Sequence, residues 1–424
     1  MNKVLFIAYL YPPIANSGTQ RSVKFSKYLG RFGWKPYVLT GTNPMGNNVD
    51  KKLLDEVSMV KDIFRVPMTS EITISNWTKY LPDSLAGFIT DKLVWRLREK
   101  NKFPDIYRDW IEAATEKGIQ IVTKNKLDLI YASGVPWSSF VVAKKISSKT
   151  GVPFIIDYRD LWTEDYAQFG NKIVSNKELN LELELLNSAN HVITVTNSIG
   201  KVLSEKINNN SEKITVITNG FDDDEFTIET ETKENGKFSF GYIGVWKENY
   251  NPEQLIMSIN KLSDAQAIQV EFIGAGFDIE KVSKITKKNT TIECLGYIPH
   301  SKAVKLMKEL DCLFVTTPDS DYSQLCLPGK IFEYLGSGTP VLAYIDADSE
   351  LWKFLEKTGG ALLVDKKEPE KLDHIIRKIA ETRIIDCPAI NKNELWKYER
   401  KNLTKNLAIT FNKVLESSNV KVNA

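Results

Sequence analysis

The residues best suited to chemistry lie in the segment 327–344, LPGKIFEYLGSGTPVLAY. Pro328 and Gly329 break the preceding loop, and KIFEYL then begins a short helix that ends at a glycine before the next apolar strand. The first N–H groups of a helix attract anions, and Lys330 adds a positive charge there. Glu333 follows one turn later on the same face and could accept hydrogen bonds from the vicinal hydroxyls of a ribose. The pattern predicts a phosphate and ribose site; a helix cap with a surface Lys–Glu pair is the structural alternative.

A second polar cluster ends the apolar run 153–158, in the sequence IIDYRDLW (155–162). Ligands bind to doubly wound sheets where the carboxyl ends of strands meet helix N-termini, so these positions are candidates. Arg159 could stabilise phosphate charge, and Asp160 could orient the hydroxyl group of an acceptor. The structural alternative is an Arg–Asp pair that anchors Trp162.

Metal chemistry is not expected. The three histidines and four scattered cysteines, which form no CxxC pair, argue against a zinc site and a disulfide framework. Acidic D-x-D triplets occur in polar loops at 222–224, 319–321 and 346–348. Loop acids are common, and lysines with backbone amides can serve a diphosphate, so no metal ligand is predicted. Asp222 is expected to cap the turn after Asn219-Gly220.

Short apolar runs that alternate with amphipathic segments must position these residues. Continuous apolar runs are typical of a parallel sheet covered on both faces, and their alternation with helices indicates α/β architecture. The predicted strands are 4–10, 36–41, 128–133, 153–158, 191–196, 238–244, 268–274, 311–317, 340–344 and 360–365, and the clearest predicted helices are 19–32, 138–150, 251–262 and 301–310.

Two doubly wound, Rossmann-like domains are predicted. The 424 residues exceed one ordinary domain, and a polar stretch at 205–237 interrupts the apolar pattern. We expect an N-terminal domain at 1–195 and a C-terminal domain at 215–385, facing each other across a cleft. The last segment, 390–424, contains a charged amphipathic helix that is expected to pack across the domain junction.

The region 45–125 fits this alternation least and is predicted to be a helical insertion in the N-terminal domain. Within it, DKLVWRLREKNK (91–102) sets basic residues around an apolar stripe. A solvated basic face is the simpler interpretation. The alternative is peripheral contact with anionic lipid or a lipid-linked substrate, because basic side chains beside tryptophan suit that boundary.

Composition excludes several classes of protein. Lysine and arginine number 56 against 54 acids, a net charge of +2, so nucleic acid is not an expected partner. A chain with 42% hydrophobic residues is not disordered. The first apolar run is cut by Pro12-Pro13, which favours a strand over a signal peptide, and no stretch has the apolar length to cross a bilayer. The expected location is the cytoplasm, with the inner face of the cell membrane as an option.

With these motifs in order along nearly the whole chain, the sequence resembles the GT-B glycosyltransferases of family 4, the retaining nucleotide-sugar enzymes also called group 1. It is most similar to the bacterial branch that builds cell-surface polysaccharides. The matching segments are YPPIANSGTQR (11–21), DLIYASGVPWSS (128–139), IIDYRDLW (155–162), ITVTNS (193–198), ITNGFD (217–222), GYIGVW (241–246), VEFIGAG (270–276), LGYIP (295–299) and PGKIFEYLGSGTPV (328–341).

The resemblance implies that Glu333 is the second glutamate of the family's paired motif, which binds the ribose of the donor. The first glutamate should lie eight residues earlier, where this chain has Leu325; Ser323, Gln324 or a backbone amide could substitute. After the first strand of the second domain, the family normally has an arginine and a lysine that contact the diphosphate; this chain has Lys247 and no nearby arginine. The histidine that many members place near Arg159 is absent. Further donor contacts are implied for Gly18, Gly244, Tyr297, Ile298, Pro328, Gly329 and Lys330.

The implied function is transfer of a sugar from a nucleoside-diphosphate donor to a glycan or lipid-linked acceptor, with retained configuration, no cofactor and no metal. Lys247, Lys330 and the helix start would stabilise charge on the leaving phosphate. No carboxylate is evident for a covalent route, so front-face attack, with the leaving phosphate assisting deprotonation of the acceptor, is expected. The alternatives are a non-catalytic glycosyltransferase-like binding subunit and a nucleotide-sugar 2-epimerase. A dehydrogenase is disfavoured because no G-x-G-x-x-G follows the first strand.

Overall fold

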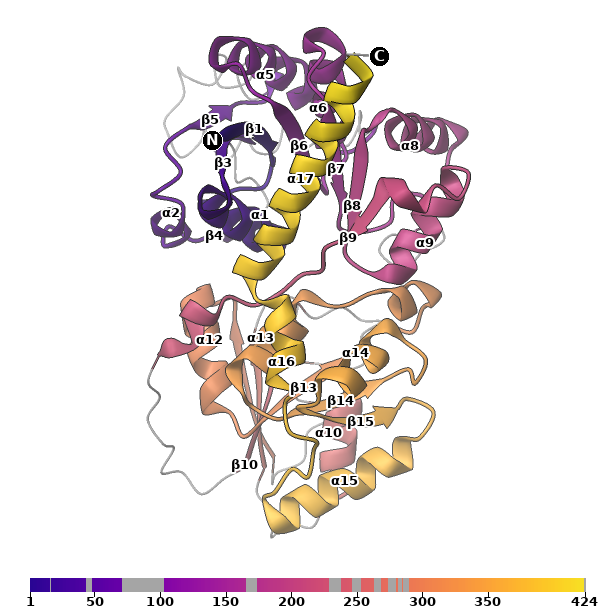
Figure 1. The fold of residues 1–424 in the computed structure, drawn as a ribbon. Coiled ribbons are helices and arrows are strands. Elements are labelled where there is room, and N and C mark those ends of the chain that lie inside the picture. The colour runs from indigo at the N-terminus through magenta and orange to yellow at the C-terminus, as the bar shows by residue number, and fades with distance from the viewer. Residues whose placement is uncertain are drawn as a thin grey trace. The chain divides into compact units, whose positions relative to one another are not determined.

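The structure is a computed structural model that describes residues 1–15, 17–42, 48–70, 103–164, 174–228, 238–245, 253–262, 268–273, 280, 284 and 290–422. The chain divides into two compact units (Figure 1). Of the described residues, those within 1–164, 174–218 and 403–422 form the first unit, and those within 219–402 form the second. Each unit is an α/β structure built on its own parallel sheet, as the sequence predicted.

The sheet of the first unit has seven parallel strands in the order β5–β3–β1–β6–β7–β8–β9. Because the strand order reverses between β1 and β6, the loops after these strands flank a topological switch point, where such sheets place their ligands. The strands are β1 Asn2–Ile7, β3 Trp34–Gly41, β5 Ile63–Val66, β6 Leu129–Gly134, β7 Phe154–Tyr158, β8 His191–Thr194 and β9 Ile214–Val216, beside the antiparallel pair β2 Ile14–Ala15 and β4 Asn48–Val49.

Helices cover both faces of this sheet, because alternate side chains of each strand point to opposite faces. Val38 packs in the cluster that holds the buried side chains of α17, whereas the neighbouring Leu39 lies beside Gly118 of α5. Figure 1 shows α17 running along the first unit. The helices are α1 Ser17–Tyr28, α2 Leu53–Glu56, α5 Ile111–Asn125, α6 Ser138–Thr150, α8 Asn176–Ser188, α9 Asn197–Lys206 and α17 Arg400–Val422, with short 3-10 turns η1 Leu29–Phe32, η2 Arg108–Trp110 and η3 Ser211–Lys213.

The second unit has a six-stranded parallel sheet in the order β12–β11–β10–β13–β14–β15. One face packs against α12, α13 and α14, and the other against α10 and α15. The strands are β10 Phe238–Ile243, β11 Ile268–Ile273, β12 Thr290–Gly296, β13 Cys312–Thr316, β14 Val341–Ile345 and β15 Ala361–Asp365. The helices are α10 Glu253–Ile259, α12 His300–Glu309, α13 Gly329–Ser337, α14 Glu350–Thr358, α15 Pro369–Thr382 and α16 Lys392–Leu395, with 3-10 turns η4 Asp223–Thr227, η6 Asp321–Leu325 and η7 Trp396–Tyr398.

Local sequence signals fix several helix ends. Ser175 and Glu178 form a reciprocal capping box at the start of α8, and the Ser349 hydroxyl accepts from the Trp352 N–H at the start of α14. Gly338, with φ of +78°, ends α13 in the left-handed conformation that favours glycine. In the described part of the chain, no helix combines the length and apolarity needed to cross a membrane.

Two boundaries differ from those expected from the sequence. The first unit extends to Thr218, past residue 195, because β9 pairs with β8 and completes the sheet. Of the predicted insertion 45–125, residues 71–102 lie outside the described residues, and in the described parts β5 is a strand of the main sheet, paired with β3, while α5 packs on α6 and on that sheet. The final helix, α17, belongs to the first unit from Leu403 onward, and its first three residues, 400–402, belong to the second unit.

Candidate functional site

The predicted phosphate site is a helix start at the carboxyl edge of the second sheet. Pro328 precedes α13, Gly329 and Lys330 form its first turn, and Gly329 is exposed. The backbone N–H groups of this turn point out of the helix, where they favour an anion. The predicted start and end of this helix are confirmed.

Lys330 and Gly244 come together at this point, although 86 positions in the sequence separate them. A Cβ atom placed on Gly244 would lie 3.3 Å from Lys330 Nζ, and Gly244 has a φ of +143° that side chains rarely adopt. Lys330 Nζ lies 3.7 Å from the centre of the Tyr242 ring, a cation–π contact. Burial lowers the pKa of Lys330 to about 7. The protonated and neutral forms of Lys330 are therefore both populated near pH 7.

Tyr334 fixes α13 against the end of β10. The Ile243 N–H donates to the Tyr334 hydroxyl at 2.8 Å, and this hydroxyl donates to Ile243 O at 3.0 Å. Burial raises the pKa of Tyr334, so its hydroxyl stays a neutral donor. Since Gly244 follows directly, this pair of hydrogen bonds holds the glycine loop beside Lys330.

Glu333 lies one turn along α13 and is 19% exposed. Its Oε1 is 4.0 Å from Nε2 of His300, the first residue of α12. The same nitrogen is 3.3 Å from Glu225 Oε2. The sequence motifs had singled out neither His300 nor Glu225, because neither lies in the segments that carry the resemblance.

The position of the first family glutamate, Leu325, ends the short turn η6. Of the substitutes considered, Ser323 uses its hydroxyl locally, donating to Ser320 O at 2.7 Å, and is 3% exposed. Gln324 is exposed. Gln324 is therefore the more accessible substitute of the two.

The predicted nucleobase loop follows β12. Gly296 turns the chain with φ of +63°, Tyr297 is 41% exposed, and Ile298 packs partly on the core of the second unit. This exposure leaves Tyr297 accessible at the same carboxyl edge of the sheet as Gly244.

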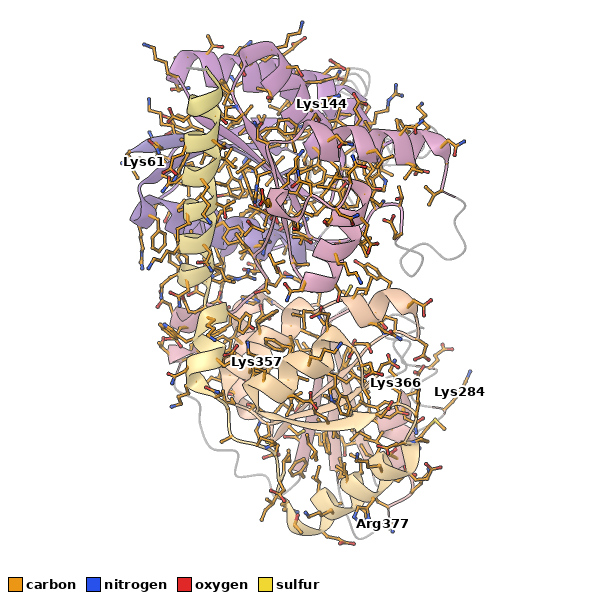
Figure 2. The ribbon with its side chains drawn as sticks, turned by 45° about the vertical axis from the view of Figure 1, so that its right-hand side comes forward. Lys61, Lys144, Lys284, Lys357, Lys366 and Arg377 are labelled. Carbon is orange, nitrogen blue, oxygen red and sulfur yellow. The ribbon has the colours of Figure 1, made fainter. Side chains whose placement is uncertain are left out.

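Lys366, labelled in Figure 2, neutralises acids of two D-x-D triplets. Its Nζ donates to Asp319 Oδ1 at 2.7 Å and to Thr317 O, and lies 4.0 Å from Asp346 Oδ2. This lysine joins the loops that follow β13, β14 and β15. In the third triplet, Asp222 Oδ1 accepts from the Asp224 N–H at 3.3 Å, which confirms its predicted role as a turn cap.

In the first unit, Arg21 and Asp157 form a buried ion pair that the sequence motifs did not indicate. Arg21 donates to both Asp157 oxygens, at 2.7 and 2.9 Å, and to Ile217 O and Thr218 O. Asp157 also accepts from the Tyr131 hydroxyl at 2.5 Å. This network is fully buried and structural, and it ties α1 to β7 and to the last residues before the second unit.

Arg159 is engaged with backbone at the switch point. Its Nε donates to Gly134 O and its Nη2 donates to Val135 O, both at 2.5 Å. A Cβ atom on Gly18 would lie 2.1 Å from Arg159 Nη1, so this glycine makes room for the guanidinium group. Gly18 was expected to let the backbone approach a donor sugar; the side chain that occupies this space is Arg159. Asp160, the next residue, is half-buried.

Trp162 is anchored by aromatic stacking. Its ring lies 5.0 Å from that of Trp137 with an interplanar angle of 7°. Trp137 in turn contacts Phe140 and Tyr158 at 5.7 and 5.3 Å. The cluster ties the start of α6 to the loop after β7.

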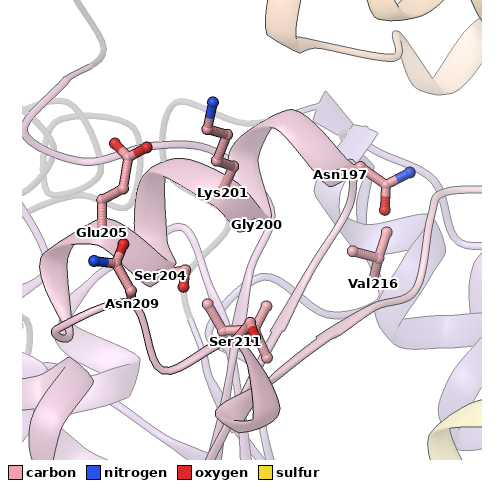
Figure 3. Close-up of a pocket in the computed structure, with 9 residues that line it drawn as sticks. Asn197, Gly200, Lys201, Ser204, Glu205, Asn209, Ser211 and Val216 are labelled. Atoms are coloured by element: carbon pink, nitrogen blue, oxygen red, sulfur yellow. The ribbon is translucent and has the colours of Figure 1, made fainter.

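An open hollow of about 360 Å³ lies between α9 and the edge strand β9 of the first unit (Figure 3). Its polar lining includes Asn197, Lys201 and Glu205. It contains none of the predicted site residues. Two further predictions, the phosphate ligand Lys247 and the basic segment 91–102, lie outside the described residues.

Comparisons with known proteins agree with this arrangement. Residues 90–225 match the family model of Glycosyltransferase Family 4. No curated protein matches the chain. Among solved structures, Anabaena Alr3699/HepE in complex with UDP and glucose is 14% identical, with 100% of both chains covered and a TM-score of 0.58.

Two other solved structures have the same architecture. The lipopolysaccharide outer core galactosyltransferase WaaB, in its apo form, is 15% identical over 98% of this chain and 99% of its own, with a TM-score of 0.55. A putative UDP-N-acetylglucosamine 2-epimerase from Listeria monocytogenes is 12% identical over 95% and 94%, with a TM-score of 0.51. The fold is GT-B. The family match and this fold confirm the resemblance to family 4 glycosyltransferases.

Proposed function

We propose that this protein is a retaining, metal-independent glycosyltransferase that moves a sugar from a nucleoside-diphosphate donor to a glycan or lipid-linked acceptor in the synthesis of a cell-surface polysaccharide. The observation that carries the proposal is the convergence of Lys330, Gly244 and the start of α13, with Glu333 one turn further on. The family match at 90–225 supports transferase activity, and the UDP and glucose bound to HepE support a UDP-sugar as donor. The activity of WaaB on lipopolysaccharide supports a surface-glycan acceptor.

The second unit has the groups to stabilise the leaving nucleotide. When the bond to the sugar breaks, negative charge grows on the β-phosphate, and preorganised cations and amides lower the barrier. Lys330, whose pKa is lowered to about 7 by burial, gains its charge as the diphosphate binds. Lys247 would be a second cation, and Glu333 would accept hydrogen bonds from the ribose hydroxyls.

The bond-forming step is proposed as front-face attack with retention. The acceptor hydroxyl approaches on the side that the diphosphate leaves, and a phosphate oxygen takes its proton. Asp160 would orient the acceptor hydroxyl. Arg159, held by two carbonyl groups, would act mainly by fixing the loop after β6.

Two contacts of the acidic triplets support the proposed metal independence. Lys366 supplies a cation to Asp319 and Asp346, so acids of two D-x-D triplets already have a counter-ion. Asp222 is used as a turn cap. The proposed location is the cytoplasm, and peripheral contact with the inner face of the membrane through 91–102 is the alternative.

One alternative has a specific observation behind it. Leu325 stands where the family has its first glutamate, which would suit a glycosyltransferase-like subunit that binds nucleotide without turning it over. The epimerase alternative shares the fold, but the family match favours a transferase.

The test is calorimetric binding of UDP and GDP, followed by turnover of their sugars with glycan and lipid-linked acceptors. Lys330→Met should weaken diphosphate binding at least about tenfold, since it removes a charged contact. Lys353→Met, at an exposed position of α14, is the matched control and should bind as the wild type does. Equal affinity in Lys330→Met and wild type would contradict the site. Tight donor binding without turnover would favour the subunit, and an inverted product would contradict retention.

A further inference from the structure

His300 joins two carboxylates that come from different elements of the second unit. Its Nε2 lies 3.3 Å from Glu225 Oε2, on η4, and 4.0 Å from Glu333 Oε1, on α13. The side chains of His300, Glu225 and Glu333 are 19%, 18% and 19% exposed, so water screens these contacts only partly. His300 also begins α12, three residues after Tyr297 of the predicted base loop.

The fold holds these three elements together independently of the histidine. Lys308 of α12 donates to the carbonyl oxygens of Phe226 and Ile228, at 2.9 and 2.5 Å, which binds η4 to α12. Phe226 packs on α13, since a Cβ atom on Gly336 would lie 3.0 Å from its ring. These contacts hold η4 against α12 and α13 without the side chain of His300.

The position of His300 between the two carboxylates has an electrostatic consequence. Two like charges near one point disfavour each other, and each would turn its oxygen atoms toward water. His300 Nε2 is within hydrogen-bond distance of Glu225 Oε2 and within ion-pair distance of Glu333 Oε1, so the imidazole ring offers both carboxylates a polar neighbour. Glu333 can then keep one carboxylate orientation, which a rigid ligand with two adjacent hydroxyls needs for both hydrogen bonds.

We propose that His300 is a positioning residue that fixes the Glu333 carboxylate toward the 2′- and 3′-hydroxyls of the donor's ribose, and so makes the site selective for ribonucleotides. This inference rests on the proposed function and deepens it, because it adds the residue that sets the sugar selectivity of the nucleotide site.

The experiment is calorimetry on the full chain with two probe pairs: UDP with 2′,3′-dideoxy-UDP, and GDP with 2′,3′-dideoxy-GDP. The measured quantity is the ratio of dissociation constants, dideoxy over ribo, for the pair that the wild type binds more tightly. The variants are Glu333→Gln, His300→Leu and His300→Gln. His374→Gln, at an exposed histidine of α15, is the matched control.

We expect a wild-type ratio of about ten or more, since hydrogen bonds to a charged group have that effect. Glu333→Gln and His300→Leu should each lower the ratio at least about fivefold, while the dissociation constant of the dideoxy probe changes less than about twofold. His300→Gln, which keeps a nitrogen donor, should recover part of the ratio. The control should keep all of it.

The remaining outcomes distinguish failure of the inference on His300 from failure of the proposed ribose site at Glu333. If Glu333→Gln loses the ratio and His300→Leu retains it, the inference on His300 is wrong and the ribose site stands. An equal loss of ribo and dideoxy binding in His300→Leu would show a merely structural role and overturn the inference. An unchanged ratio in Glu333→Gln, or a wild type that binds neither pair, would contradict the proposed site itself and the inference with it.

Discussion

Replacing Gly18 by alanine should destabilise the first unit through one side chain, that of Arg159. The added Cβ atom would lie 2.1 Å from Arg159 Nη1 and 2.9 Å from both Cζ and Nη2. The end of an arginine side chain can usually move away at little cost. Here it cannot, because Nε and Nη2 are bonded to the carbonyl oxygens of Gly134 and Val135, both at 2.5 Å.

The size of the effect follows from those two hydrogen bonds. A hydrogen bond from a charged group contributes about 1.5–3 kcal/mol, and displacing the guanidinium group weakens both. Alanine is favoured over glycine in a helix by up to about 1 kcal/mol, which offsets part of the loss. We expect a net loss of about 2–4 kcal/mol in the free energy of unfolding, or roughly 5–15 °C in the melting temperature of this unit.

The assay is urea and thermal unfolding followed by intrinsic tryptophan fluorescence, to which the stacked Trp137–Trp162 pair of the first unit contributes. The matched control is Gly30→Ala, where the nearest atom to a new Cβ is Met1 Cε at 3.8 Å; it should be within about 0.5 kcal/mol of wild type. The decisive variant is Gly18→Ala in an Arg159→Met background. There, Gly18→Ala should cost nothing further. If the two substitutions are additive, the clash with Arg159 is not the cause and the reasoning is refuted.

Three further predictions concern Lys330, the glycine loop at Gly244 and the half-buried His191. Burial lowers the pKa of Lys330 to about 7, and a bound diphosphate favours the charged lysine, so binding takes up a proton. The affinity for UDP-glucose should therefore fall by up to about tenfold per pH unit above pH 7 in the wild type and should not change with pH in Lys330→Arg. Equal pH dependence of the affinity in the two proteins would contradict the role of Lys330. Gly244→Ala should lower both the stability of the protein and its affinity for UDP. In the control Gly338→Ala, φ is +78° and no atom lies within 4 Å of the new Cβ, so stability should fall by about 1 kcal/mol and the affinity for UDP should not change. Equal affinities of the two variants for UDP would show that Gly244 has no role beside Lys330. Burial, with Lys213 and Lys413 nearby, lowers the pKa of His191 to about 4, so the contribution of neutral His191 to the free energy of unfolding is complete above pH 6.5 and is lost as the pH falls to 4. Between pH 6.5 and 4, the free energy of unfolding should fall less in His191→Asn than in the wild type, by up to about 3 kcal/mol. An equal fall in the two proteins would show that His191 does not titrate in this range.

The sequence predicted the elements whose signals are local. Every predicted strand is present, since continuous apolar runs suffice to mark buried parallel strands. Of the strands in the two parallel sheets, three were not predicted. β12, with the sequence TTIECLG, alternates polar and apolar residues and so lacks a continuous apolar run. β5 and β9 are only four and three residues long. The helix start at Lys330 was predicted because glycine, lysine and the helix pattern are adjacent in the chain.

Contacts that depend on distant residues were not predicted. Arg21 reaches Asp157 across 136 positions, and only the folded sheet brings α1 to the end of β7. The role of Arg159 depends on the carbonyl groups of a neighbouring loop, which carry no sequence signal. His300 lies 33 positions from Glu333 and 75 from Glu225, so their convergence follows from the packing of α12, α13 and η4.

The central claim is that the start of α13 holds the diphosphate of the donor. The most direct measurement is a crystal structure of the full chain with UDP bound. The account predicts a phosphate oxygen at about 3 Å from Lys330 Nζ and from a backbone N–H of the first turn of α13, with the ribose hydroxyls on Glu333. The account would be contradicted if UDP bound elsewhere, or if its phosphates made no contact with Lys330 and Lys330 Nζ stayed over the Tyr242 ring.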